Sequence, residues 1–156
     1  MRARWHGRRS GFLRSDSLGA GAAVAYVGRS VDSLRTNQLH LPVRGNGDGG
    51  MYSTAADLSS FWPAFFDGRI VSKEWAATMA EPRSDVPSER KRYGLGFWLA
   101  RAGPAVLLEG FDAGVSFRSA HDPVRGSGYT VLSNMSWGAW PLVQLLDAEV
   151  LGLSVV

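Results

Sequence analysis

The chain has 156 residues, 45% of them hydrophobic and 20% charged, and these ordinary values fit one folded domain. It has no cysteine and three scattered histidines, which excludes disulfides, a thiol nucleophile and cysteine-based zinc sites and disfavours a histidine metal centre. No apolar run reaches the ~18–20 residues of a membrane span, so we expect a soluble protein without metal or cofactor.

Positive charge is concentrated at the amino terminus. Residues 1–50 hold eight arginines against three aspartates, and five of these arginines precede the first acid. A basic arm can contact phosphates or anionic lipid, but this one lacks interleaved aromatic residues and a nucleic-acid motif. We therefore predict a disordered arm over 1–14 with no nucleic-acid partner. No apolar segment of ~7–15 residues follows it, so we expect no signal peptide and, by default, a cytoplasmic location.

The next part of the chain leads to a glycine-rich loop and a helix. Residues 19–27 fit a short strand or a loop, and 36–50 form an extended approach that ends in glycines. Ser53 or Thr54 predicts a helix start, and apolar residues repeat at helical spacing until Asp67-Gly68. The loop has the letters G-x-G-x-x-G, but it lacks the flanking parallel strands of a dinucleotide site, so no nucleotide is expected.

A second, shorter helix is predicted from Lys73 to Ala80, with Ser72 as its N-cap. Residues 83–92 mix both charge signs and predict an exposed, mobile loop. Residues 93–99 then predict one strand with glycines on one face. The buried face of the second helix is expected to hold Trp75, Ala76 and Met79.

The stretch 105–134 organises the rest of the chain. Short runs rich in Val, Leu, Phe, Tyr and Thr are separated by turn sequences, which predicts an antiparallel meander. A final helix is predicted from Trp137 to Leu153, capped by Ser136, with Pro141 in its first turns. The fold class is therefore α+β, with a sheet of about three strands, two helices after the glycine loop and a carboxy-terminal helix. The buried stripe of that last helix is expected to hold Leu142, Leu145, Leu146 and Val150.

Two carboxylates and a glycine interrupt the first apolar strand of this meander, at Glu109, Gly110, Phe111 and Asp112. They fit a binding site, and they equally fit a structural interpretation in which Gly110 marks a bulge and Asp112 accepts hydrogen bonds in a turn. Serine catalysis has little support from the residues alone. The chain contains no Gly-x-Ser-x-Gly, and the letters Ser-x-x-Lys occur only at Ser88-Glu89-Arg90-Lys91, within the polar stretch 83–92 and not at the start of a predicted helix. The cluster of Ser116, Ser119, His121 and Asp122 is ordinary composition.

Four blocks, 49–58, 93–98, 109–117 and 130–134, together resemble the carboxy-terminal half of the serine beta-lactamase-related family, which includes class C beta-lactamases, DD-peptidases and related esterases. The resemblance runs from about Phe12 to the last helix. It implies a partial beta-lactamase or transpeptidase-like fold, so that 15–156 would be the carboxy-terminal part of such a domain. It also implies hydrolysis of an ester or amide through an acyl-enzyme, with a Ser-x-x-Lys serine as nucleophile.

The resemblance also assigns expected roles to residues. The third family motif, Lys-Thr-Gly or His-x-Gly on a strand beside the cleft, falls on Leu108-Glu109-Gly110, where the glycine is present and the basic residue is absent. An acidic Glu109 there would repel a substrate carboxylate, which favours an esterase-like or diverged relative over penicillin recognition. No catalytic residue is expected in this chain. The expected substrate-binding residues are Glu109, Gly110, Phe111 and Asp112, and the expected loop beside the cleft holds Gly49, Gly50 and Tyr52.

Two functions follow as hypotheses. In the first, the chain is a truncated hydrolase of this family that is inactive alone because a Ser-x-x-Lys at a helix start and a Tyr-x-Asn are absent. Its partners would be a small ester or amide substrate and either a missing amino-terminal segment or a second copy. In the second, it is a non-catalytic binding or scaffolding module that pairs through an exposed sheet edge. Both lead us to expect an association-prone fold with an unpaired strand.

Overall fold

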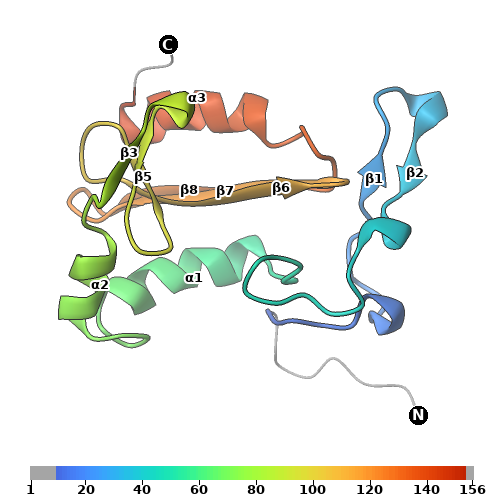
Figure 1. The fold of residues 1–156 in the computed structure, drawn as a ribbon, viewed down its shortest axis with the longest axis horizontal. Helices are drawn as coiled ribbons and strands as arrows, with labels where there is room; N and C mark the ends of the chain where they lie inside the picture. The colour runs from blue at the N-terminus through green and yellow to red at the C-terminus, as the bar shows by residue number, and fades with distance from the viewer. Residues whose placement is uncertain (1–9, 154–156) are drawn as a thin grey trace.

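The computed structural model describes residues 10–153, so that residues 1–9 of the predicted basic arm lie outside the described residues. Figure 1 shows three layers, with the main sheet between α1 on one side and α3 on the other. The helices are α1 (Ala55–Phe66), α2 (Lys73–Met79) and α3 (Trp140–Leu151). The strands are β1 (Tyr26–Val27), β2 (Arg35–Thr36), β3 (Ser84–Val86), β4 (Lys91–Tyr93), β5 (Trp98–Ala100), β6 (Val106–Asp112), β7 (Val115–Asp122) and β8 (Ser127–Ser133).

The main sheet is an antiparallel meander in which strands adjacent in sequence are adjacent in space. Its order is β3-β4-β5-β6-β7-β8, so the predicted three-stranded meander is confirmed and three further strands extend it. Ala113 and Gly114 form the turn between β6 and β7, and Gly114 has a φ of 82°, a conformation that favours glycine. This turn fixes a register in which Glu109 faces Arg118.

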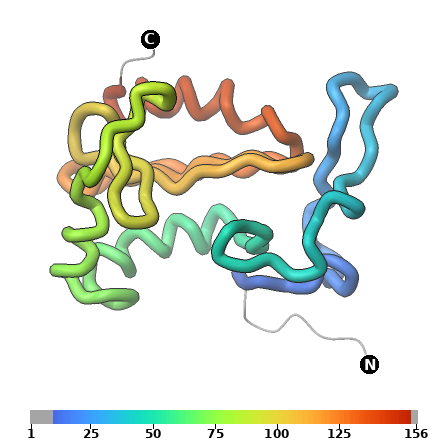
Figure 2. The backbone as a smooth tube through the Cα atoms, viewed as in Figure 1, coloured from blue at the N-terminus to red at the C-terminus, as the bar shows by residue number. Residues whose placement is uncertain are grey.

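A two-stranded ribbon of β1 and β2 stands beside one end of the sheet (Figure 2). The backbone N–H of Tyr26 donates to the carbonyl of Asn134 over 2.9 Å. The Asn134 side chain donates in turn to the carbonyl of Val24 over 3.0 Å. Of the segment 19–27, which fits strand or loop by sequence, only Tyr26–Val27 is a strand, held at the end of β8, and the rest is loop.

The predicted start of α1 is confirmed, and so is its end at Asp67. Thr54 Oγ1 accepts a hydrogen bond from the backbone N–H of Asp57 over 3.1 Å, which satisfies one free donor of the first turn. Trp62 and Phe65 are each 2% exposed and pack against Phe97 and Val106. This aromatic cluster holds α1 on the sheet, and burying each such side chain contributes on the order of 1.5–3 kcal/mol.

α2 also begins where the sequence predicts, because Ser72 Oγ accepts from the backbone N–H of Trp75 over 3.3 Å. Its predicted buried face is partly wrong. Ala76 is buried in the cluster around Trp62, whereas Trp75 is exposed. The helix has only seven residues, so its contact with α1 and β5 uses one narrow stripe and leaves the adjacent indole outside.

The loop expected at 83–92 is instead a hairpin of β3 and β4, and the single strand expected at 93–99 is two strands joined by a turn. Arg92 Nε donates to the carbonyl of Ala100, and Arg92 Nη2 to the carbonyl of Gly103, both over 2.9 Å. Lys91 pairs with Glu109. The charges of Lys91 and Arg92 are therefore satisfied by partners distant in the sequence, whereas the charged residues of 83–90 are exposed as predicted.

α3 begins three residues later than predicted, and Ser136 does not cap it. The Ser136 hydroxyl accepts from the N–H of Gly114 over 2.8 Å and donates to the carbonyl of Asp112 over 2.9 Å, so it fixes the β6–β7 turn. Pro141 lies in the first turn as expected. The predicted stripe is wrong in part: Leu142 and Leu145 are exposed, while Val143 and Leu151 are the buried residues. None of the helices in the described part of the chain is long and apolar enough to span a membrane.

Candidate functional site

The outer side of β6 is open over most of its length. β5 pairs with β6 only at Leu107 and Val106, because β5 has three residues. β7 pairs with β6 over all seven residues, from Val106 to Asp112. From Leu108 onward, β6 thus has a strand neighbour on one side only within residues 10–153. About half of these residues direct their backbone N–H and C=O groups to that open side, where an extended ligand can pair with them.

The four residues predicted for substrate binding all lie on this open segment, but their side chains point to opposite faces of the sheet. Successive residues of a strand alternate between faces. Leu108 packs with the aromatic cluster under α1, and Gly110 lies beside Phe117 on the same face. Glu109 and Phe111 lie on the face that carries α3. The four residues are therefore neighbours along one strand, but their side chains do not form one cluster.

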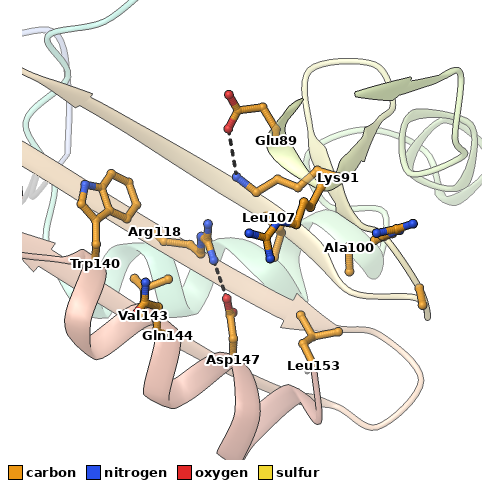
Figure 3. Close-up of a pocket in the computed structure, with 13 residues that line it drawn as sticks. Glu89, Lys91, Ala100, Leu107, Arg118, Trp140, Val143, Gln144, Asp147 and Leu153 are labelled. Carbon is orange, nitrogen blue, oxygen red and sulfur yellow. Dashed lines mark hydrogen bonds and ion pairs between the residues drawn. The ribbon is translucent and has the colours of Figure 1, made fainter. Parts of the chain in front are cut away.

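Glu109 is held in an ion-pair network between the sheet and α3. One carboxylate oxygen pairs with Lys91 Nζ, and the other accepts from Arg118 Nε over 2.6 Å. Arg118 Nη1 donates to Asp147 over 2.6 Å (Figure 3). Asp147 also accepts from the Tyr129 hydroxyl. The Glu109 and Arg118 side chains are each 10% exposed. Glu109 and Asp147 thus share two cationic partners, Lys91 and Arg118, and Lys91 Nζ also lies 4.0 Å from the exposed carboxylate of Glu89.

The electrostatics of this network follow from burial and pairing. Burial lowers the pKa of Arg118, but the charges of Glu109 and Asp147 outweigh it and raise the pKa above its ordinary value. Burial and the hydrogen bond to Asp147 raise the pKa of Tyr129. Both groups therefore keep their protons at neutral pH. A repulsion between Glu109 and a substrate carboxylate stays a prediction, and the adjacent cations weaken it.

A groove of about 880 Å³ lies over this network, between α3 and the β4–β5 hairpin. Leu107, Arg118 and Asp147 line its inner part (Figure 3). Arg90 and Arg101 also line the groove. Among the described residues, no buried side-chain nitrogen or oxygen lacks a hydrogen-bond partner, and no group of His, Asp and Glu is placed to hold a metal ion. The groove is therefore a surface feature with charged walls and offers no preformed cation site in this part of the chain.

Phe111 and Asp112 are the last two residues of the open segment of β6. The Phe111 ring is exposed and lies 5.2 Å from the Trp137 ring, centroid to centroid. The Asp112 carboxylate accepts from the N–H of Ala113 over 2.6 Å, which is the turn role that the structural interpretation assigns to it. Gly110 is paired regularly with Phe117, so it marks no bulge.

The glycine loop is closed on itself. Asn46 and Gly49 exchange backbone hydrogen bonds, and a Cβ on Gly45 would lie 2.4 Å from the backbone of Gly50. Tyr52 pairs with Gly11 through two backbone hydrogen bonds, and burial raises the pKa of its phenol. In Figure 1 the loop precedes α1 at the end of the molecule where β6 turns into β7, on the α1 side of the sheet. No hydrogen bond or ion pair within the described range joins the loop to 109–112.

The serines and histidine near the end of β7 form no catalytic arrangement. Ser116 Oγ donates to the carbonyl of Met135 over 2.7 Å. Ser119 is fully buried and accepts from Trp62 Nε1 over 2.8 Å. The His121 ring stacks on Trp62 at 5.8 Å between centroids, and burial lowers its pKa. These side chains hold the layers together.

Sequence reasoning missed the partners of Glu109. The signal was present, because a two-residue turn at Ala113-Gly114 places Glu109 opposite Arg118. The pairing of Lys91 with Glu109 could not be predicted from a local turn, because it requires β4 to pair with β5 and β5 to pair with β6.

Comparison with known proteins places this geometry among solved structures. No family model and no curated protein sequence matches the chain. A penicillin-binding protein from Bacillus halodurans matches with a TM-score of 0.81 and 30% identity, over 89% of this chain and 44% of that one. An octameric penicillin-binding protein homologue from Pyrococcus abyssi matches with a TM-score of 0.71 and 22% identity, over 94% and 35%. A D-stereospecific amidohydrolase from a Streptomyces species matches with a TM-score of 0.71 and 20% identity, over 94% and 45%. The chain thus spans less than half the length of each of these three proteins.

Proposed function

The chain has part of the fold of the serine beta-lactamase-related family, and we propose that it supplies the substrate-binding strand of an acyl-enzyme hydrolase of that family. The observation that carries the proposal is the open side of β6 from Leu108 to Asp112, since β5 pairs with it only at Val106 and Leu107. The third family motif falls by resemblance on this same segment. An extended ester or amide substrate would pair with the backbone there.

The chemistry of this strand favours a substrate without a carboxylate. Where the family motif has lysine or histidine, this chain has Leu108, whose side chain packs in the core. The next residue, Glu109, is already paired with Lys91 and Arg118. The strand therefore offers no free cation to a substrate anion, so we propose an uncharged ester or amide as the substrate class.

The nucleophile is not proposed to lie in these 156 residues. Acylation in the family needs the serine of a Ser-x-x-Lys at a helix start. The one serine of this chain followed by lysine at the third place, Ser88, lies in a three-residue 3-10 turn between β3 and β4, and its Lys91 is paired with Glu109. Ser116 and Ser119, the serines of β7, are engaged in the hydrogen bonds described above. The chain alone should be inactive, and the activity would depend on an amino-terminal segment.

Two measurements test the proposal. Treatment of the chain with an acylating ester probe should label no serine stoichiometrically, and stoichiometric labelling of one serine would contradict inactivity. A chimera with the amino-terminal part of the Bacillus halodurans protein should hydrolyse an uncharged ester. In this chimera, Leu108→His should raise kcat/KM for a carboxylate-bearing ester and leave kcat/KM for the uncharged ester unchanged. Gly110→Val would obstruct the strand and should lower kcat/KM at least ~10-fold, and an unchanged value would argue against this substrate strand.

A non-catalytic binding or scaffolding module is the second candidate. The observation that favours it is the unpaired edge of β8 at the far side of the same sheet. One homologue of this fold is described as octameric, which supports self-association as a property to test here. Loss of hydrolysis in every chimera together with a stable complex through β8 would favour this candidate over the hydrolase.

A further inference from the structure

Three aromatic rings gather at the end of the open segment of β6, on the face of the sheet that carries α3. The Phe111 ring lies 5.2 Å from the Trp137 ring and 6.4 Å from the Trp140 ring, centroid to centroid. Phe111 belongs to β6, Trp140 begins α3, and Trp137 lies in the loop between β8 and α3. We call these three side chains the Phe111 patch.

Two rings of the Phe111 patch face solvent although they lie side by side. Phe111 is 61% exposed and Trp137 is 60% exposed. Their mutual contact therefore buries only a part of each ring, and most of the apolar area of both stays open to water. Contiguous exposed apolar side chains commonly mark a binding surface, and aromatic side chains contribute large contact areas to such surfaces. The patch is thus suited to an apolar ligand.

The β6–β7 turn determines which backbone groups of the open segment are available to a ligand. Asp112 and Val115 flank this two-residue turn, so they form the hydrogen-bonded pair that closes it. Hydrogen-bonded and non-hydrogen-bonded pairs alternate along an antiparallel ladder, so the next pair, Phe111 with Ser116, is not hydrogen-bonded. The N–H and C=O of Phe111 are therefore directed away from β7. An extended ligand would form its hydrogen bonds with them.

This pairing decides which group of the ligand meets the patch. Groups directly opposite each other on neighbouring strands lie on the same face of the sheet, ~4.5–5.5 Å apart. The Phe111 ring is on the α3 face, together with Trp137. A substituent of the ligand opposite Phe111 would therefore lie on the α3 face, against these two rings. The next substituent along the ligand would lie on the other face, beside Gly110.

The surroundings of the patch favour an uncharged, flat substituent. Glu109, the preceding residue on this face of β6, is paired with Arg118. The guanidinium of Arg118 lies 5.9 Å from the Trp140 ring. Since these two charges satisfy each other, the rings are what the strand offers to a ligand on this face. Aromatic groups pack on aromatic rings in offset or edge-to-face geometry, which gives them an advantage over aliphatic groups of similar size.

We propose that the Phe111 patch is a specificity subsite that binds an aromatic substituent of the substrate, so that the substrate is an uncharged ester or amide bearing an aromatic group. The inference rests on the proposed hydrolase function, because it uses the same open strand, and it names the substituent that this strand recognises. Phe111 lies two strands away from β8. The subsite therefore leaves the β8 edge to an amino-terminal segment.

Titration of the chain itself tests the subsite independently of catalysis. The probe is racemic N-acetylphenylalanine amide, an uncharged extended molecule with one benzyl group, and the matched aliphatic probe is N-acetylcyclohexylalanine amide. In NMR spectra of the six indole N–H groups, the benzyl probe should shift the Trp137 and Trp140 signals saturably. Trp75 is the internal control, since it is equally exposed at 60% but lies on α2, and its signal should not shift. The aliphatic probe should bind at least ~3-fold more weakly.

Leucine variants identify the rings that bind the probe. Trp137→Leu and Phe111→Leu each keep an apolar side chain and remove a ring, so each should raise the dissociation constant of the benzyl probe at least ~3-fold. Trp75→Leu should leave that constant unchanged. Circular dichroism would verify that the three variants fold. No saturable shift at Trp137, equal binding of the two probes, or equal effects of Trp137→Leu and Trp75→Leu would overturn the proposal.

The chimera described above separates this inference from the hydrolase function. The readout is the ratio of kcat/KM for the ethyl ester of N-acetylphenylalanine to kcat/KM for that of N-acetylalanine. This ratio should fall at least ~3-fold in Trp137→Leu and stay constant in Trp75→Leu. An active chimera whose ratio is the same in both variants would refute the aromatic subsite and leave the hydrolase standing. An inactive chimera would refute the hydrolase, whereas the titration decides whether the patch binds an aromatic group.

Discussion

Glu109 and Arg118 face each other across β6 and β7, and Arg118 Nε donates to the Glu109 carboxylate over 2.6 Å under the cover of α3. Arg118 is also the partner of Asp147 on α3, and its guanidinium lies 5.9 Å from the Trp140 ring. One side chain thus connects the candidate substrate strand to the last helix. The position of Glu109 below the open edge of β6 depends on this connection.

We expect Arg118→Met to destabilise the fold by about 3–5 kcal/mol, because it leaves Glu109 and Asp147 buried with one fewer cation between them. Urea denaturation would measure the change. The control is Arg14→Met, which removes the exposed pair of Arg14 with Asp16 and should cost less than ~1 kcal/mol. Equal losses in the two variants would show that the buried network contributes nothing beyond a surface pair.

The alkaline pH dependence of stability should report Tyr129. Burial and the hydrogen bond to Asp147 raise the pKa of this phenol, so the folded chain holds the proton more tightly than the unfolded chain, whose tyrosines titrate near ~10. This contribution is complete below pH ~10 and is lost as the pH rises above it. Urea midpoints should therefore fall more steeply between pH 9 and 11 in the parent chain than in Tyr129→Phe. Parallel profiles would contradict the assignment.

One buried side-chain hydrogen bond joins α1 to β7 beside the aromatic cluster. Ser119 is fully buried and accepts from Trp62 Nε1 over 2.8 Å. Ser119→Ala leaves the indole N–H without this acceptor, so we expect a loss of about 1–3 kcal/mol in thermal or urea unfolding. Ser60→Ala, which removes only an exposed bond to the carbonyl of Ala56, should change stability by less than ~0.5 kcal/mol. A neutral Ser119→Ala would mean that another group or water satisfies Trp62.

Local signals in the sequence predicted the parts of the fold that depend on neighbours in the chain. Thr54 and Ser72 begin their helices as predicted, because an N-cap needs only the next three residues. The meander followed from its short turns. The hairpin at 84–93 was missed because Lys91 reaches Glu109, and Arg92 reaches Ala100 and Gly103, through pairings that no local pattern encodes.

The last helix shows the same limit. Periodicity predicted a buried stripe with Leu142 and Leu145, yet both are exposed and Val143 is buried. The rotation of α3 is set by the salt bridge of Asp147 with Arg118 and by the contact of Val143 with Val131. For the candidate site, the sequence predicts that 109–112 bind substrate, and this stays a prediction. The division of these residues between two faces of the sheet follows only from the pairing of β6 with β7.

A close backbone contact should make Gly94 intolerant of any side chain. A Cβ there would lie 2.2 Å from the carbonyl oxygen of Met79, a backbone atom that also accepts from the N–H of Leu95. Gly94→Ala must push α2 away from the β4–β5 turn, and overpacking of this kind costs on the order of 1–3 kcal/mol. Gly21→Ala is the matched control, because its Cβ would meet no atom within 4 Å, and we expect it to be near neutral. Urea unfolding of both variants, with hydrogen exchange of α2 as a local measure, would detect the difference. If the two variants unfold at the same urea concentration, α2 adjusts without cost and the contact does not fix its position.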